Sequence, residues 1–276
     1  MTLKLGRHLL LGAAGLAAGA LTYAHRIEPN RIDANEITVP LRHLDPAFDG
    51  YTIVQISDIH MSGSMTRERL AAAVAVANQY NPDVVAITGD FATRRLSLNV
   101  ADLIEPLCQL RAIDGKFAVL GNHDYRNSRA AVRLVIRSSQ LTPLHNAVHT
   151  IRRGAAVLHF AGVESVIQHR ARLDRVLNVL PADGTAILLA HEPDFADIAA
   201  ATDRFALQLS GHSHGGQVRL PFVTNFVLPA FSRRYVMGLY RVGTMQLYVN
   251  RGLGTVGIPF RFNCLPEVTI LRLSAG

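Results

Sequence analysis

The sequence predicts an α/β fold in which two β-sheets face each other and helices cover their outer sides. Three observations favour it. After residue 50, short β-rich runs alternate with helical stretches. The chain is 49% hydrophobic, which is enough for a sizeable core. A polar cluster follows each strand run of the first half. Because α/β sheets place ligand-binding residues beyond the carboxyl ends of their strands, these clusters predict a site at one sheet edge.

The first half of this region contains strands and helices in strict alternation. Strands are predicted over 51–57, 84–88 and 116–120, and helices over 67–79 and 98–110. This spacing is typical of βαβ units and favours a largely parallel core.

The second half repeats the alternation less regularly. Residues 142–163 predict two or three strands around a turn at Arg153-Gly154. No boundary is visible after residue 50, so residues 51–276 are predicted to form one domain. The other predicted elements are helices over 171–179 and 194–201, and strands over 186–190, 205–210, 245–250 and 267–273.

The N-terminus differs from the rest of the chain. Leu9 to Ala24 carry no charge and follow Lys4 and Arg7, which is the pattern of a signal peptide or signal anchor. A membrane span needs about 20 apolar residues, so this stretch is short, but its glycines are common in membrane helices. We predict that residues 1–25 form an apolar helix that acts as an uncleaved membrane anchor, with a cleaved signal as the alternative.

The following residues, 26–50, connect this helix to the domain. They are rich in charge and contain three prolines, Pro29, Pro40 and Pro46. They predict a juxtamembrane linker that leads into a first edge strand near Glu36 to Val39.

Charge and cysteine content limit the partners. The net charge of +7 suits an anionic partner such as phosphate or an anionic membrane surface. The arginines form no long basic run, so a nucleic-acid partner is not expected. Cys108 and Cys264 form no C-x-x-C pair, so neither a disulfide framework nor a thiolate zinc site is indicated. The sequence predicts no oligomeric state.

Seven residues with oxygen or imidazole side chains stand at predicted strand ends. Such a set suits two borderline divalent metals such as Mn, Fe or Zn, with a carboxylate as the natural bridge. Two metals about 3.5–4 Å apart can activate a water and clamp phosphoryl oxygens. Gly89, Gly121 and Gly211 each precede a ligand, where the chain must turn sharply. The seven are Asp58, His60, Asp90, Asn122, His191, His212 and His214.

These residues resemble the signature of the calcineurin-like metallophosphoesterases, D-x-H, G-D, G-N-H-D, H and G-H-x-H. All five blocks are present in order, and the resemblance covers the chain from about residue 50 to its end. It implies a four-layer sandwich of two mixed β-sheets flanked by helices. The blocks here are Asp58-Ile59-His60, Gly89-Asp90, Gly121-Asn122-His123-Asp124, His191 and Gly211-His212-Ser213-His214.

The resemblance also implies a role for each residue. Asp58, His60 and His214 would hold the first metal, and Asn122, His191 and His212 the second. Asp90 would bridge the two ions, of which manganese is expected first and iron or zinc as alternatives. His123 would stand beside the leaving-group oxygen as a proton donor, and Asp124 would orient it.

The wording GHSHGGQ, the segment VNRGLGT (249–255) and the N-terminal stretch resemble one bacterial branch of this family. That branch contains membrane-associated phosphodiesterases and the UDP-2,3-diacylglucosamine pyrophosphatases of lipid A synthesis. It implies hydrolysis of a phosphodiester or pyrophosphate bond in a lipid-linked substrate at the bacterial inner membrane, with the membrane side left open. The alternatives are a membrane-tethered enzyme for soluble substrates and a non-catalytic scaffold, which the intact ligand set argues against.

Two further features have open interpretations. Arg94, Arg95 and Arg126 follow ligand loops and are predicted to bind a substrate phosphate, although a solvated face is an equal alternative. Segment 219–240 combines aromatic residues with Arg233 and Arg234. It is either a lipid-facing lid or packing on the second sheet, and we favour packing.

Overall fold

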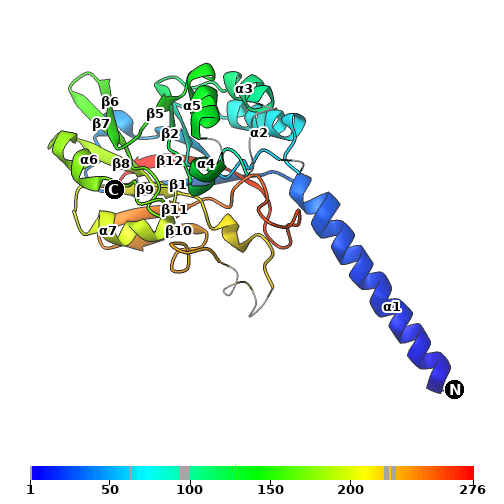
Figure 1. Ribbon diagram of the computed structural model, residues 1–276. Helices are drawn as coiled ribbons and strands as arrows, with labels where there is room; N and C mark the ends of the chain where they lie inside the picture. Colours follow the sequence, from blue (N-terminus) through cyan, green and yellow to red (C-terminus); the bar gives the residue numbers. More distant parts are fainter. Residues whose placement is uncertain (1, 63, 94–99, 128, 221–223, 225–227) are drawn as a thin grey trace.

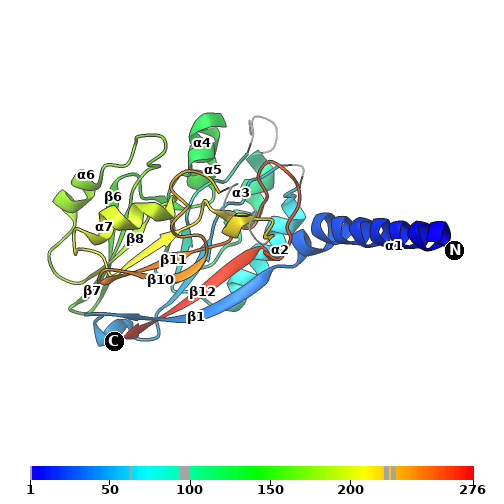
Figure 2. The same cartoon turned by 90° about the horizontal axis from the view of Figure 1, so that it is seen from below.

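The computed structural model describes the chain except residues 1, 63, 94–99, 128, 221–223 and 225–227. Two six-stranded sheets pack face to face, and helices cover both outer sides (Figures 1 and 2). The predicted sandwich of mixed sheets is therefore confirmed. Helix α1 (Thr2–Thr22) extends away from this body (Figure 1).

The first sheet has the strand order β1-β12-β2-β3-β4-β5. Its β2 to β5 strands are parallel, as the alternation with helices predicts, whereas β12 runs antiparallel to β2 and parallel to β1. The strands are β1 (Asp33–Leu41), β2 (Thr52–Ile56), β3 (Val84–Ile87), β4 (Gly115–Ala118), β5 (Thr142–Pro143) and β12 (Glu267–Ala275).

The second sheet has the order β10-β11-β9-β8-β7-β6. Parallel strands β7, β8, β9 and β11 form its middle, and antiparallel hairpins close both edges. The predicted turn at Gly154 joins β6 to β7, while β10 was not predicted. The strands are β6 (Ala147–Arg153), β7 (Ala156–Gly162), β8 (Thr185–Leu189), β9 (Leu207–Ser210), β10 (Gly238–Val242) and β11 (Met245–Val249).

The strands place alternate residues on opposite faces, which divides the core into layers. In β2, Ile53 lies between the sheets with Leu158 and Leu189, whereas Val54 faces the first helical layer. A third cluster packs the second sheet against α6 and α7. The helices are α2 (Arg67–Gln79), α3 (Val100–Cys108), α4 (Asn122–Asn127), α5 (Arg129–Ser138), α6 (Leu173–Val179) and α7 (Ala196–Ala200). Of these, α4 and α5 were not predicted.

The N-terminal region contains the predicted edge strand, but this strand is longer than the expected segment from Glu36 to Val39. The expected linker contains β1, a nine-residue edge strand whose Val39 and Leu41 are buried between the sheets. The expected anchor is helical, but among the described residues no helix is long and apolar enough to cross a membrane.

Candidate metal centre

The seven predicted ligands meet at one edge of the sandwich, where carboxyl ends of both sheets come together. Asp58 and His60 follow β2, Asp90 follows β3, and Asn122 begins α4 just after β4. From the second sheet, His191 follows β8, and His212 and His214 follow β9. All seven side chains are buried, with at most 5% of their surface exposed. The structure thus places all seven candidate ligands just after strands, as the sequence predicts, and brings them together.

The backbone at these positions is unusual. Five of the seven have positive φ angles of 48° to 67°, a left-handed conformation that residues other than glycine seldom adopt. Each such residue costs about 1–3 kcal/mol and persists only where its surroundings impose it, often at functional sites. The five are Asp58, His60, Asp90, His212 and His214.

Two of the predicted glycines explain how the ligand loops approach one another. A Cβ atom on Gly121 would lie 2.1 Å from Oδ1 of Asp90, and one on Gly211 would lie 2.2 Å from Oδ2 of Asp58. Any side chain there would displace a ligand carboxylate. Both glycines are therefore required by the close approach of backbone to ligand.

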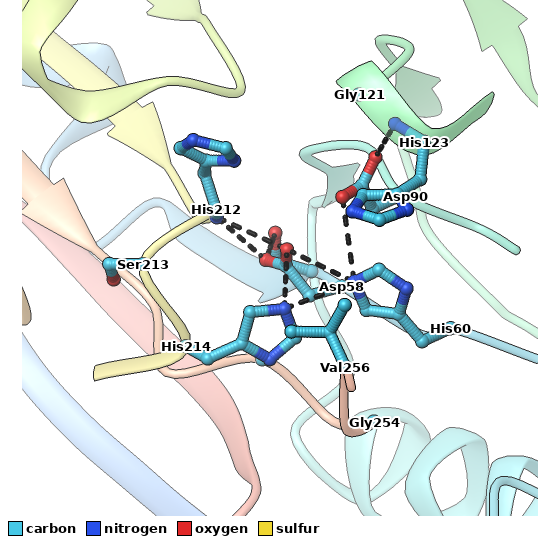
Figure 3. A network of polar contacts seen from close by, with 12 residues as sticks. Asp58, His60, Asp90, Gly121, His123, His212, Ser213, His214, Gly254 and Val256 are labelled. Atoms are coloured by element: carbon cyan, nitrogen blue, oxygen red, sulfur yellow. Dashed lines mark hydrogen bonds and ion pairs between the residues drawn. The ribbon is translucent and has the colours of Figure 1, made fainter. Parts of the chain in front are cut away.

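The first pocket is formed by Asp58, His60 and His214, whose ligand atoms all lie within 4.8 Å of one another (Figure 3). Nε2 of His60 lies 3.0 Å from Nε2 of His214, which in turn lies 3.3 Å from Oδ1 of Asp58. Nδ1 of His60 contacts the Thr93 hydroxyl at 2.8 Å, which fixes the ring with Nε2 toward the pocket.

The second pocket is formed by Asp90, His191 and His212, under the same 4.8 Å limit. Nδ1 of His191 donates to the Thr88 carbonyl at 2.7 Å, which fixes the ring with Nε2 toward Asp90 in this pocket. In His212 the roles are reversed, because Nε2 donates to the Ala230 carbonyl at 2.9 Å.

Asp90 lies between the two pockets. Its Oδ2 is 3.4 Å from Nε2 of His60 and 3.2 Å from Nε2 of His191, so a single oxygen contacts an imidazole from each pocket. Its Oδ1 accepts the backbone N–H of His123 at 2.9 Å (Figure 3). This is the position that a bridging carboxylate requires.

The donor set fits two divalent cations. Asn122 Oδ1 is a buried polar atom without a hydrogen-bond partner among the described residues, a state that costs free energy unless something binds it. Burial lowers the pKa of His60 to about 4 and also lowers the pKa values of His212 and His214. These imidazoles are therefore neutral, which is the form that ligates a metal.

His191 and Asp90 form a charge-coupled pair. Burial alone would lower the pKa of His191, but the Asp90 carboxylate raises it well above its usual value. Burial opposes ionisation of Asp90 as well, yet His191 holds the pKa of that carboxyl well below its usual range. Asp90 is therefore ionised, as a bridging ligand must be.

His123 stands beside the ligands without joining either group. Its ring packs edge-on against that of His60 with centroids 5.0 Å apart, and its side chain is partly exposed. It is thus within the site yet reachable from solvent, as expected of a group that faces a substrate.

Asp124 does not have the predicted contact with His123 in the hydrogen bonds of the described residues. Its carboxylate instead accepts backbone N–H groups from Asp90, Phe91 and Gly121, each at 2.9 Å, and from Ala92 at 3.3 Å. The expectation that it orients the imidazole is corrected. Asp124 ties the loop after β3 to the start of α4, because a fully buried carboxylate takes the nearest unpaired amides.

The predicted phosphate-binding arginines are only partly described. Arg94 and Arg95 lie outside the described residues, and Arg126 is exposed on α4, the helix that begins with Asn122. Arg129, which follows it, lies 3.6 Å from Glu164 and over the ring of Tyr125.

The second half of segment 219–240 contacts residues of the metal centre. The Ala230 carbonyl accepts from His212, and the Val236 carbonyl accepts from the Ser213 hydroxyl. Tyr235 is buried and donates to Asp197 at 2.9 Å, as packing on the second sheet predicts. Phe222 and Phe226, two of the aromatic residues of this segment that a lid would use, lie outside the described residues.

Sequence reasoning missed the residues that hold the ligands in place. Thr88, Thr93 and Ala230 position imidazoles, and Gly252 lies with its Cα against Asp58, where an added Cβ would meet the Asp58 Cβ at 2.7 Å. The sequence pointed to one of these residues only indirectly: Gly252 lies in the segment VNRGLGT, which resembles the bacterial branch but had no predicted role.

Comparison with known proteins matches this geometry. The profile described as calcineurin-like phosphoesterase matches residues 51–216. The chain is 34% identical to the metallophosphoesterase YkuE of Bacillus subtilis over 98% of its own length and 97% of that protein. It is 28% identical to the phosphodiesterase YaeI of Escherichia coli, covering 97% of this chain and 98% of that protein. The NAD nucleotidase of Haemophilus influenzae superposes with a TM-score of 0.51 at 14% identity, over 73% of this chain and 50% of that one, which shows a shared fold.

Proposed function

Because the chain belongs to the calcineurin-like phosphoesterase family of metal-dependent hydrolases, we propose that it cleaves a phosphodiester or pyrophosphate bond with two divalent cations. The observation that carries the proposal is the position of Asp90, whose Oδ2 lies 3.4 Å from an imidazole of the first pocket and 3.2 Å from one of the second. A carboxylate with two oxygens can serve both cations at once.

The residues divide the work among them. Asp58, His60 and His214 would hold one cation and Asn122, His191 and His212 the other. Bound cations supply Lewis-acid stabilisation of phosphoryl oxygens and lower the pKa of the attacking water. His123, partly exposed beside His60, would donate a proton to the leaving oxygen.

Manganese is the proposed metal. The two pockets contain four imidazoles, His60, His214, His191 and His212, together with carboxylates. Magnesium prefers all-oxygen shells with retained waters, whereas a donor set that mixes carboxylates with imidazoles suits borderline transition metals such as manganese, iron and zinc. The mixed donor set therefore favours Mn over Mg.

The test is hydrolysis of bis(p-nitrophenyl) phosphate by the purified chain. We expect EDTA dialysis to abolish hydrolysis and Mn to restore it at least as well as Mg. Full activity in protein that elemental analysis shows to be metal-free would overturn the proposal.

We further propose that the natural substrate is lipid-linked, with UDP-2,3-diacylglucosamine as one member of that class, and that α1 attaches the domain to the bacterial inner membrane. The supporting observation is that α1 extends from the body with Leu11, Leu16 and Leu21 exposed by 60% or more (Figure 1). The charge of +7 would favour anionic headgroups. The competing candidate, a tethered enzyme for soluble substrates, has the same support from α1.

Cell fractionation and paired substrates separate these candidates. The full chain should sediment with membranes and should hydrolyse a lipid-linked pyrophosphate in vesicles faster than the same headgroup without acyl chains. Equal rates on both would favour the soluble-substrate candidate, and recovery of the chain in the supernatant would refute attachment.

A further inference from the structure

Arg261 is the largest side chain that is completely buried in the described part of the chain. Its guanidinium donates to backbone carbonyls: Nη2 to Gly252 at 2.9 Å, Nη2 and Nε to Gly254 at 2.6 and 3.2 Å, and Nη1 to Cys264 at 3.1 Å. Removing a guanidinium from water costs free energy that only a full set of hydrogen bonds offsets. The side chain is therefore fixed to the loop that contains both glycines.

These two glycines form the floor of the first metal pocket. A Cβ on Gly252 would lie 2.7 Å from the Asp58 Cβ, and one on Gly254 would lie 2.8 Å from the His60 Cβ. The Gly254 N–H also donates to the Asp58 carbonyl at 2.8 Å. Arg261 thus holds the loop that presses directly on two ligands of the first pocket.

The third ligand of that pocket is held by the same turn. The Cys264 thiol donates to the His214 carbonyl at 3.2 Å. Burial raises the pKa of this thiol, so it keeps the proton that it donates. Turn 261–264 therefore contacts His214 directly, and it contacts Asp58 and His60 through the loop that contains Gly252 and Gly254.

The other side of this turn is attached to the N-terminal segment that follows α1. The Arg261 N–H donates to the Ala24 carbonyl at 2.8 Å, within the single π-helical turn η1 (Tyr23–Ile27). The buried carboxylate of Glu28 accepts the N–H of Asn263 at 3.0 Å and that of Cys264. Glu28 thus fixes the backbone of residues 263 and 264 to the N-terminal segment.

We propose that Arg261 and Glu28 are positioning residues for the first metal ion, clamping turn 261–264 between the N-terminal segment and the ligands Asp58, His60 and His214. This inference rests on the proposed two-metal site. The second pocket is held by other contacts, through Thr88 and Ala230. Disrupting the contacts of Arg261 or Glu28 should therefore weaken binding of the cation in the first pocket and leave binding in the second pocket unchanged.

The experiment measures Mn²⁺ affinity of the full chain by calorimetry in two backgrounds. His191→Ala disables the second pocket and reports on the first, whereas His60→Ala disables the first. Adding Arg261→Met should weaken Mn²⁺ binding about 10- to 100-fold in the His191→Ala background, the usual effect of losing a residue that orients ligands. It should leave binding nearly unchanged in the His60→Ala background. Arg261→Lys should restore part of the loss, because it can still donate to some of the carbonyls.

Arg153→Met is the matched control. Arg153 is also tied into the fold, lying 2.7 Å from Asp83 and 3.2 Å from Asp114, but these residues flank the amino ends of β3 and β4, opposite the metal edge. Arg153→Met should lower the free energy of unfolding, but it should not reduce the Mn²⁺ affinity of one pocket more than that of the other.

If Arg261→Met weakens Mn²⁺ binding equally in both pockets, or in neither, the proposed positioning role is wrong. A wild-type chain that binds no Mn²⁺ would contradict the proposed function itself. If Arg261→Met does not fold, Glu28→Gln carries the test in the same two backgrounds. Selective weakening of the first pocket supports the clamp, and unchanged affinity there refutes it.

Discussion

The two aspartates of the metal centre have different surroundings. Asp58 Oδ2 accepts the Ser57 hydroxyl at 2.6 Å and the His212 N–H at 2.9 Å, so only Oδ1 is directed at the first pocket. Asp90 uses one oxygen toward both pockets. The two aspartates are therefore expected to have different roles in metal binding, and substituting each in turn should distinguish these roles.

Asp90→Ala should lose both cations and activity, because neither pocket keeps its shared oxygen. Asp58→Ala should retain one cation per chain, since the second pocket is intact. Elemental analysis after gel filtration measures both. Two cations retained by Asp90→Ala would contradict the bridging role.

His123→Ala should retain both cations while its turnover falls on the order of 10²–10⁴-fold, as expected for the loss of a general acid. The loss should be smaller on a substrate with a p-nitrophenolate leaving group, which needs no proton. If this variant instead binds less metal, His123 is a ligand and its assignment is wrong.

At the scale of elements, the centre depends on how the loop after β3 meets the start of α4. Asp124 joins them by accepting four backbone N–H groups. Asp124→Ala would leave these buried amides unpaired, at a cost of about 3 kcal/mol or more in the free energy of unfolding. Urea denaturation measures this. Asp174→Ala, which removes an exposed carboxylate paired with Arg172 at the surface, is the control and should change stability little. Equal midpoints for the two variants would contradict the account of Asp124.

The N-terminal elements should separate into a dispensable and a required part. α1 ends at Thr22, whereas Ala24 and Glu28 contact residues 261–264. A chain beginning at Tyr23 should therefore hydrolyse a small diester at the rate of the full chain. A chain beginning at Arg31 should need more Mn²⁺ to reach half its activity. Equal Mn²⁺ requirements in both shortened chains would show that the segment 23–30 contributes nothing to the centre.

For the molecule as a whole, the strands and ligands were predictable because each is a local pattern. The runs 51–57 and 84–88 are β-rich, and each ends in a ligand. The left-handed backbone of Asp58 and His212 was not predictable, since their surroundings impose it against residue preference. Arg261 was equally hidden, because its side chain binds carbonyls of an irregular loop and its N–H meets Ala24 only when the segment after α1 packs on the body.

The short elements were missed or misjudged in length for a related reason. Helix α4 spans only Asn122–Asn127, too short for an amphipathic period, and β10 alternates weakly at the edge of the second sheet. β1 was predicted as a short edge strand, but its pairing with β12 extends over Asp33–Leu41. Long-range pairing, which no local pattern encodes, sets these boundaries.

The central claim is that two cations share one carboxylate and that hydrolysis requires both. Titrating metal-free protein with Mn²⁺, while measuring bound metal and diester hydrolysis in the same samples, tests it most directly. We predict binding that saturates at two Mn²⁺ per chain, with activity rising as the second ion binds. Saturation at one ion with full activity, or activity without bound metal, would contradict the claim.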